Sequence, residues 1–273
     1  MIIDVLSKSE LKEIQNIELG ALIEFDRVCR KHKINYCLTG GTLLGAIRHH
    51  GFIPWDDDVD IAVMRSDYDR LSRICKKEMD PKYFYQDHRT DKNWYRLYAK
   101  IRVNNTVFKE LAHNNQSIHH GVFIDIFPID VIPDEKQKAT KQYLLYQLFC
   151  KGISAKYINN ECRSGKKRLF AEMAKLIYLP FSLSFLFRKA EMIARKYNQS
   201  NNRMVINFSG AYGNKEVFPK EFFLNTMDYK FENHVFRIPK SYDVMLKQLY
   251  GNYMELPPRS KRISHHKIVE LSL

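Results

Sequence analysis

The chain has 273 residues, 45% hydrophobic and 13% aromatic, so a sizeable core is expected and extensive disorder is excluded. Its five cysteines are scattered without a CxxC pair, which favours reduced thiols in a cytoplasmic protein over a disulfide framework or a zinc site. No stretch approaches the roughly 20 apolar residues of a membrane-spanning helix, and the charged N-terminus is not typical of a signal peptide.

The net charge of +13 is divided unevenly along the chain. Residues 1–134 carry a net charge of −1, whereas residues 135–273 carry +14. This asymmetry favours metal chemistry in the first part and an anionic partner for the second, with solubility as the alternative reason for the basic charge. Nucleic acid is not favoured as that partner, because no nucleic-acid-binding motif accompanies the charge.

The first 134 residues alternate between helical and extended patterns. Ser7 and Glu10 form a capping-box pattern that predicts the start of the first helix. Apolar spacing predicts helices over residues 7–31, 42–50 and 66–77, and strands over residues 36–39, 59–64, 83–86, 95–103 and 122–126. This order predicts an α+β fold in which helices flank a mixed β-sheet core, here assigned to residues 1–134.

The pattern changes after Pro133. Residues 135–205 are predicted to form a basic helical insertion, and residues 206–273 a C-terminal segment that packs back on the core. Residues 136–203 hold 15 Lys and Arg against three acids, and residues 169–187 are mostly apolar but contain Pro180. Two interpretations fit: a helix lying on an anionic membrane surface, or helices that pack their apolar faces within the protein.

Four aspartates, Asp56, Asp57, Asp58 and Asp60, precede an apolar run that is typical of a buried strand. Carboxylates this close repel one another unless solvent or a cation relieves them. If the backbone is extended from Asp56, then Asp56, Asp58 and Asp60 share one face, while Asp57 points away, where solvent would surround it. The cluster predicts a divalent metal site that handles phosphates.

Asp125 is the predicted partner of this cluster. It is a lone acid in the apolar run GVFIDIFP, and a buried carboxylate without a partner is costly. A metal beside Asp58 and Asp60 would offset that cost. The alternative is a strand-end aspartate that accepts backbone hydrogen bonds, and the first cluster favours the metal. Asp130 lies nearer a turn and is interpreted as structural.

A paired glycine, Gly40-Gly41, lies between a predicted strand and a predicted helix. Glycines let the backbone approach a ligand closely, and a helix N-terminus presents free N–H groups to an anion. The turn Gly40-Gly41-Thr42 is therefore a candidate phosphate-binding element. The cations proposed to contact phosphate are Arg48, Lys100 and Arg102.

These cations have structural alternatives. Arg48 is equally explained as a helix-end cation, and Lys100 and Arg102 as a solvent-facing strand edge. The pair His265-His266 is not expected to chelate a metal, because adjacent residues do not share a face. Exposed tail histidines are the favoured interpretation, over a contact of one of them with the donor phosphate.

The string CLTGGTLLGAIRHHGFIPWDDDVDIAVMRSDYDRL closely resembles the LicD family, the phosphorylcholine transferases related to the fukutin group. The resemblance continues at GVFIDIFPID and at VFRIPKSYDVMLKQLYGNYMELPP. It implies a nucleotidyltransferase-like fold and transfer of a substituted phosphate, such as phosphocholine, from a CDP-linked donor. The implied acceptor is a hydroxyl of a cell-surface glycan, such as lipopolysaccharide or a teichoic-acid-like polymer, often lipid-linked.

The family pattern also assigns roles to residues. It implies metal ligands at Asp56, Asp58, Asp60 and Asp125, which would hold Mg²⁺ or Mn²⁺. It implies phosphate binding at Gly40, Gly41 and Thr42. The expected location is the cytoplasm, with peripheral association at the inner face of the membrane as a further expectation.

Two other functions remain open on the residues alone. One is nucleotidyl transfer that releases pyrophosphate, and the other is a non-catalytic protein that binds an anionic membrane or polymer. The intact acids argue against the second. The residues do not select among choline, ribitol and glycerol as the donor head group.

Overall fold

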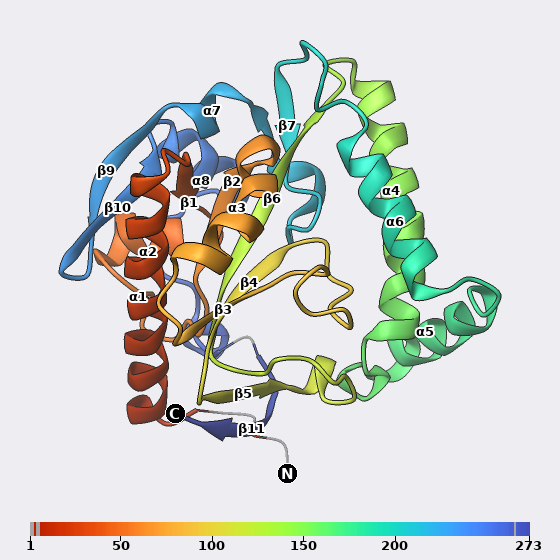
Figure 1. Cartoon of the computed structure of the whole chain (residues 1–273), viewed down its shortest axis with the longest axis horizontal. Helices are drawn as coiled ribbons and strands as arrows, with labels where there is room; N and C mark the ends of the chain where they lie inside the picture. The colour runs from red at the N-terminus through yellow and green to blue at the C-terminus, as the bar shows by residue number, and fades with distance from the viewer. Residues whose placement is uncertain (1–2, 4–5, 265) are drawn as a thin grey trace.

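The computed structural model describes residues 3, 6–264 and 266–273, which form eight α-helices and eleven β-strands (Figure 1). The helices are α1 (Lys8–Lys31), α2 (Gly40–His49), α3 (Arg65–Glu78), α4 (Lys136–Tyr157), α5 (Gly165–Ile177), α6 (Leu183–Arg195), α7 (Glu221–Leu224) and α8 (Tyr242–Tyr250). The strands are β1 (Tyr36–Leu38), β2 (Asp60–Met64), β3 (Tyr83–Gln86), β4 (Ala99–Val103), β5 (Val107–Glu110), β6 (Phe123–Ile132), β7 (Met204–Ile206), β8 (Val217–Pro219), β9 (Thr226–Phe231), β10 (His234–Pro239) and β11 (Ile268–Ser272).

Strand β6 organises the main sheet, whose order is β1-β2-β6-β4-β3. It pairs in parallel with β2 and antiparallel with β4, and its second half pairs with β7, which in turn pairs with β8. Two smaller sheets are formed by β9 with β10 and by β5 with β11. The predicted α+β fold with a mixed sheet is therefore confirmed.

Helix α1 shows how the sequence produces an element of this fold. The Ser7 hydroxyl accepts from the Glu10 N–H at 3.2 Å, and the Glu10 carboxylate accepts from the Ser7 N–H at 2.8 Å, so the predicted capping box is present. Leu22, Phe25 and Val28, at spacings of three, are fully buried in the core cluster that also covers the sheet.

Some predicted boundaries were wrong. Strand β6 continues to Ile132 because its second half pairs with β7. Helix α3 begins at Arg65, and its N-cap position is Met64. Ser66, where this helix was predicted to begin, is therefore its second residue. The strand predicted over residues 95–103 is reduced to β4, preceded by a loop in which Trp94 is buried and donates to the Tyr98 carbonyl at 2.8 Å.

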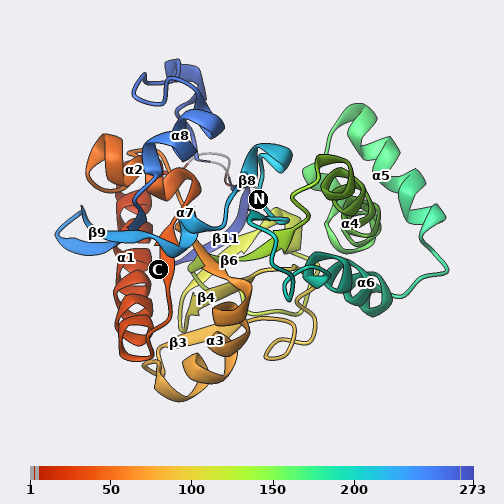
Figure 2. The same ribbon diagram turned by 90° about the horizontal axis from the view of Figure 1, so that it is seen from above.

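Helices α4, α5 and α6 form a separate group beside the sheet (Figures 1 and 2). Tyr146 and Ile153 of α4 share a buried cluster with Leu186 and Phe187 of α6. The apolar stretch 169–187 breaks near Pro180, so its second part packs in α6 while α5 stays largely exposed. No helix in the described ranges has the length and hydropathy that crossing a membrane requires. The proposed domain boundaries stay a prediction.

Candidate active site

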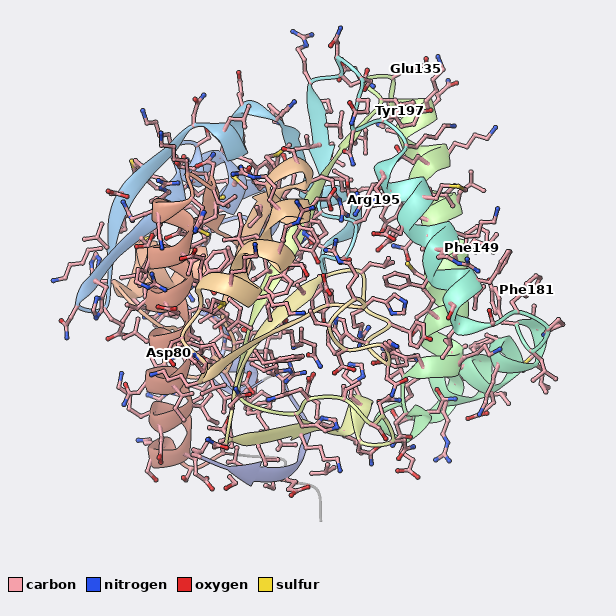
Figure 3. All side chains as sticks on the ribbon, in the orientation of Figure 1. Asp80, Glu135, Phe149, Phe181, Arg195 and Tyr197 are labelled. Atoms are coloured by element: carbon pink, nitrogen blue, oxygen red, sulfur yellow. The ribbon has the colours of Figure 1, made fainter. Side chains whose placement is uncertain are left out.

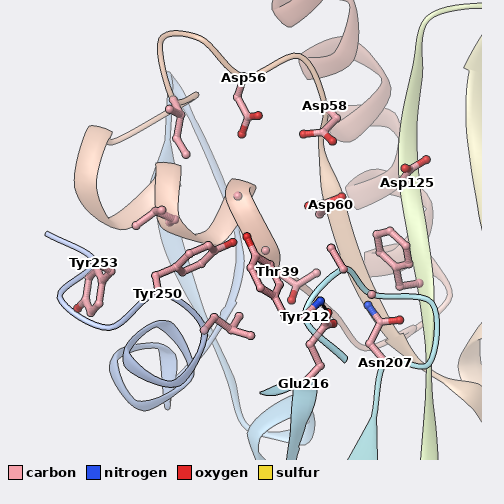
Figure 4. Close-up of a pocket in the computed structure, with 18 of the residues that line it drawn as sticks. Thr39, Asp56, Asp58, Asp60, Asp125, Asn207, Tyr212, Glu216, Tyr250 and Tyr253 are labelled. Carbon is pink, nitrogen blue, oxygen red and sulfur yellow. Dashed lines mark hydrogen bonds between the residues drawn. The ribbon is translucent and has the colours of Figure 1, made fainter. Parts of the chain in front are cut away.

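A cavity of about 1040 Å³ opens beside the parallel strands β2 and β6. Its walls come from the start of α2, the loop before β2, the loop between β7 and β8, and the region after α8. Figure 4 shows acids on one wall, with Tyr212 and Glu216 across the space. Seven of the ten predicted site residues line this cavity: Gly40, Gly41, Arg48, Asp56, Asp58, Asp60 and Asp125.

The sheet register brings the two acidic segments together. Asp60 of β2 lies opposite Asp125 of β6, although 64 intervening residues separate them in the sequence. Asp56 and Asp58 approach from the loop before β2 (Figure 4). The prediction that Asp56, Asp58 and Asp60 share one side is confirmed by the cavity lining. Asp57 is 0% exposed and does not line the cavity, so the expectation of a solvated Asp57 was wrong.

The four acids are crowded together: Asp56 and Asp125 are buried, and Asp58 and Asp60 are half-buried. Burial raises the pKa of Asp60 well above its ordinary value, and the charges of Asp58 and Asp125 raise it further. Burial likewise raises the pKa of Asp56, with added repulsion from Asp58. The pKa of Asp125 is raised by burial, although the Lys100 ammonium opposes that shift. Keeping these carboxylates ionised is therefore costly unless a positive charge lies close to them.

The acids at the cavity offer carboxylate oxygens, which are ligands that a divalent ion such as Mg²⁺ prefers. Between the described side chains, no three from His, Cys, Asp and Glu are grouped closely enough to enclose a metal ion. Mg²⁺, however, usually binds one or two carboxylates and completes its shell with water and substrate phosphate. Four carboxylates on one cavity, with raised pKa values, fit an ion held in that way.

The paired glycine, Gly40-Gly41, packs closely against Asp60 and Asp56. Gly40 has φ of +55°, and a Cβ added there would lie 2.5 Å from Oδ2 of Asp60. A Cβ at Gly41 would lie 2.7 Å from Oδ2 of Asp56. Only glycine leaves space at both positions, and the N-terminus of α2 begins here, where free N–H groups favour an anion. A phosphate in this corner would lie between the helix terminus and the carboxylates.

Thr42 and Arg48 are positioned by protein contacts. The Thr42 hydroxyl accepts from the Asp60 N–H at 2.8 Å and ties α2 to β2, and Thr42 does not line the cavity. Arg48 does line it, and its Nη1 donates to the carbonyls of Tyr253 at 2.8 Å and Glu255 at 3.1 Å. Arg48 therefore anchors the segment after α8 at the cavity edge.

Lys100 and Arg102 are placed differently from both interpretations of the sequence. Strand β4 is internal to the sheet, so the predicted solvent-facing edge was wrong: the two residues are 1% and 0% exposed. Neither lines the cavity, so direct phosphate contact is not supported. Lys100 Nζ lies 2.9 Å from Oδ1 of Asp125 and 3.7 Å from Oε2 of Glu110. Lys100 thus lies outside the cavity and forms an ion pair with Asp125, one of the acids that line it.

His266, in the C-terminal segment, lies at the cavity and not on an exposed tail. Its side chain is only 20% exposed and lines the cavity, so the expectation of an exposed tail was wrong for this residue. His265 lies outside the described residues. Nδ1 of His266 lies 3.2 Å from Oδ1 of Asp57 and Nε2 lies 3.8 Å from Oε1 of Glu110. Burial alone would lower the pKa of His266, but Asp57 and Glu110 raise it to about 10.

The opposite wall was missed by the sequence interpretation. The loop between β7 and β8 carries Asn207, Tyr212 and Glu216, all at the cavity (Figure 4). The Glu216 carboxylate accepts a hydrogen bond from the Tyr212 N–H at 2.8 Å. It also packs against Gly210, where an added Cβ would lie only 2.0 Å from the carboxylate oxygens. Burial raises the pKa of Glu216 to about 7. The only signal in the sequence was a turn-rich, aromatic composition.

Glu216 predicts a measurable pH dependence of stability. Its folded pKa of about 7 exceeds the ordinary value of 4.5, so folding favours the protonated form. The contribution is present below pH 4.5 and is lost as pH rises through 7, at a cost on the order of 3 kcal/mol. In urea denaturation with EDTA, Glu216→Gln should match the wild type at low pH and exceed its stability above neutral pH. Parallel stability curves across that range would contradict the assignment.

An acid-lined cavity beside a glycine turn, in a mixed α+β fold, defines a protein that handles phosphate groups. Residues 33–160 match the model of the family described as LicD/FKTN/FKRP, nucleotidyltransferase domain. Over 271 residues the chain is 31% identical to the lipopolysaccharide cholinephosphotransferase LicD of Haemophilus influenzae, covering 96% of this chain and 97% of that protein. The chain therefore belongs to the LicD family, and the prediction of a phosphotransferase is confirmed.

Two further relatives come from Rickettsia. The uncharacterised protein RP689 of Rickettsia prowazekii is 52% identical over 160 residues, which are 58% of this chain and 56% of that protein. The uncharacterised protein RT0683 of Rickettsia typhi is 57% identical over 75 residues, which are 25% of this chain and 24% of that protein. These likenesses support no activity, since neither protein is characterised.

Proposed function

We propose that the chain transfers phosphocholine from a CDP-linked donor to a hydroxyl of a lipopolysaccharide-type glycan, using Mg²⁺ or Mn²⁺. The core is proposed to be nucleotidyltransferase-like. The observation that carries the proposal is the convergence of four acids and the Gly40-Gly41 turn on one cavity. The similarity to the Haemophilus enzyme over nearly its whole length supports the choice of head group and acceptor.

Asp58 and Asp60 are proposed as the principal metal ligands, with Asp56 and Asp125 completing the acidic wall. A bound divalent ion would neutralise phosphate oxygens and stabilise the leaving group. Two contacts within the chain hold these acids in position. Lys100 forms an ion pair with Asp125, and the Thr42 hydroxyl accepts a hydrogen bond from the Asp60 N–H at the start of β2.

The protein's part in the transfer is mainly positioning. The glycine turn allows the donor diphosphate to lie close to the backbone at the N-terminus of α2. The acceptor oxygen forms a bond to the phosphorus that carries choline, and the bond from that phosphorus to the CMP oxygen breaks. The acceptor proton passes to a carboxylate facing the cavity, either Asp56 or Glu216. Asp57 is an unsuitable base, because it is buried against His266.

The cavity also offers a place for a cationic head group. Trp55, Tyr212, Tyr250 and Tyr253 line it, and the rings of Tyr212 and Tyr250 meet edge to face at 5.2 Å. Quaternary ammonium groups bind over aromatic faces, whereas a polyol would need hydroxyl-binding polar groups. Glu216 adds a carboxylate to the same wall. These rings fit a choline head group, but the same cavity also holds Asn207, Ser209 and Asn252, so the choice of choline over ribitol or glycerol rests on the similarity to the Haemophilus enzyme.

Product analysis with purified protein tests the proposal. Incubation with CDP-choline and a lipooligosaccharide acceptor should release CMP and label the glycan, and EDTA should reduce the rate by about a hundredfold or more. CDP-ribitol and CDP-glycerol serve as matched donors and should react more slowly. Release of pyrophosphate from CTP, without CMP release from CDP-choline, would establish nucleotidyl transfer and overturn the proposal.

A further inference from the structure

Helix α5 and the turn after it expose an unusual amount of apolar surface. Of the eighteen large hydrophobic side chains that are exposed in the described part, seven lie between residues 169 and 181. Phe181 lies at the outer edge of the helical group (Figure 3). Six of the seven, each between 50% and 71% exposed, define what we call the α5 face: Leu169, Phe170, Met173, Leu176, Ile177 and Leu179.

The α5 face points away from the protein because the other side of the helix is the one that packs. Ala171 is the buried residue of α5, and the helix rests on α4. The following Tyr178 donates from its hydroxyl to the Leu148 carbonyl at 2.7 Å, and its ring lies 2.6 Å from where a Cβ on Gly152 would stand. Leu148 is itself 49% exposed. One side of helix α5 therefore packs on α4 through the small side chain of Ala171. The other side presents large apolar side chains to solvent.

Cations accompany this apolar surface. Lys166, Lys167, Arg168 and Lys175 of α5 are exposed, against the single acid Glu172, to which the Asn160 side-chain amide donates at 2.6 Å. Across residues 136–203 the net charge is +12. A helix with one bulky apolar face and flanking lysines is suited to the boundary between lipid headgroups and acyl chains.

We propose that the α5 face docks on an anionic lipid bilayer, with the helix lying in the plane of the membrane surface. Pairing of two copies through this face would bring two segments of +12 together, and like charges oppose that association. An anionic surface satisfies both the apolar side chains and the cations. The α5 face is thus assigned to peripheral membrane binding.

The position of α4 relates this docking surface to the catalytic cavity. A second cavity of about 300 Å³ runs along α4, where Gln147, Lys151 and Ser154 form part of its wall. The two cavities share four wall residues: Arg96, Tyr98, Ser209 and Gly210. If the proposed function holds, a bilayer bound at α5 would lie on the same side of the catalytic cavity as α4 and this second cavity. The docking itself does not depend on that function.

Vesicle co-sedimentation of the full chain tests the proposal. The protein should bind vesicles of phosphatidylcholine containing about 30% phosphatidylglycerol, and binding should fall with added salt. Leu176→Glu/Ile177→Glu should weaken binding about tenfold or more, because both side chains are exposed and would be withdrawn from the lipid. Lys166→Glu/Lys167→Glu should weaken it similarly without touching the apolar residues.

The control variant, Leu224→Glu/Val244→Glu, changes two side chains of 50% and 52% exposure outside α5 and should bind normally. CMP release from CDP-choline in solution should be unchanged in all three variants, so docking and the proposed function can fail independently. Circular dichroism checks folding, and if the α5 variant does not fold, the lysine variant decides. Unchanged binding, or a dimer that the α5 variant dissociates in light scattering, would overturn the proposal.

Discussion

Replacing Asp58 and Asp60 together by asparagine is expected to lower the rate of CMP release by about a thousandfold or more. The same change should stabilise the metal-free protein. Burial raises the pKa values of both carboxylates, and the charges of neighbouring aspartates add to the shift, so their ionised forms oppose folding at neutral pH. Asparagine keeps the size of the side chain and removes the charge. Activity and stability should therefore move in opposite directions.

The measurements are the initial rate with CDP-choline and the thermal midpoint in EDTA. Added Mg²⁺ should raise the thermal midpoint of the wild type more than that of the double variant, because ion binding stabilises the folded state. Glu13→Gln, an exposed acid on α1, is the control and should change neither quantity. An active double variant would refute the assignment of these acids to catalysis.

Replacing Arg65 by methionine is expected to destabilise the protein by about 3–5 kcal/mol, the usual cost of breaking a buried ion pair. Arg65 donates to both oxygens of Asp130, at 2.8 Å and 2.7 Å, and Asp130 is 0% exposed. Asn198 donates to the same carboxylate at 2.7 Å. Without Arg65, the Asp130 charge would remain buried between β6 and α3. The interpretation of Asp130 as structural agrees with these contacts.

Urea denaturation measures this cost, and a second substitution identifies its cause. The double variant Arg65→Met/Asp130→Leu should recover much of the lost stability, since no unpaired charge is left. The matched surface pair is Lys247 and Asp243, 66% and 47% exposed, where Lys247→Met should cost less than about 1 kcal/mol. A double variant no more stable than the single one would show that packing, not the charge, is responsible.

The local patterns in the sequence predicted which acids lie together at the cavity: Asp56, Asp58, Asp60 and Asp125. The two-residue period separated Asp57 from Asp56 and Asp58, because alternation depends only on an extended backbone. The cost of burying a lone carboxylate pointed to Asp125, and the register of β2 with β6 places it opposite Asp60. The first inference used local backbone geometry and the second the cost of burying one charge, so neither needed knowledge of distant contacts.

The remaining residues depend on contacts that the sequence does not encode locally. Lys100 alternates with apolar neighbours as an edge-strand residue would, yet β4 is covered on both edges and its lysine pairs with Asp125. His266 and Glu216 lie more than 90 residues from Asp125 in the sequence and reach the cavity through loops. Their positions follow from tertiary packing, which overrides local preference.

The contact of His266 with Asp57 has a consequence for synthesis of the chain. Translation produces the acids early, whereas the histidine that meets their loop, and the strand β11 that follows it, are made more than 200 residues later. A nascent chain on the ribosome therefore carries the acidic loop without its imidazole partner. The loop therefore reaches its final charge balance only after the last residues of the chain, which include β11, have been synthesised.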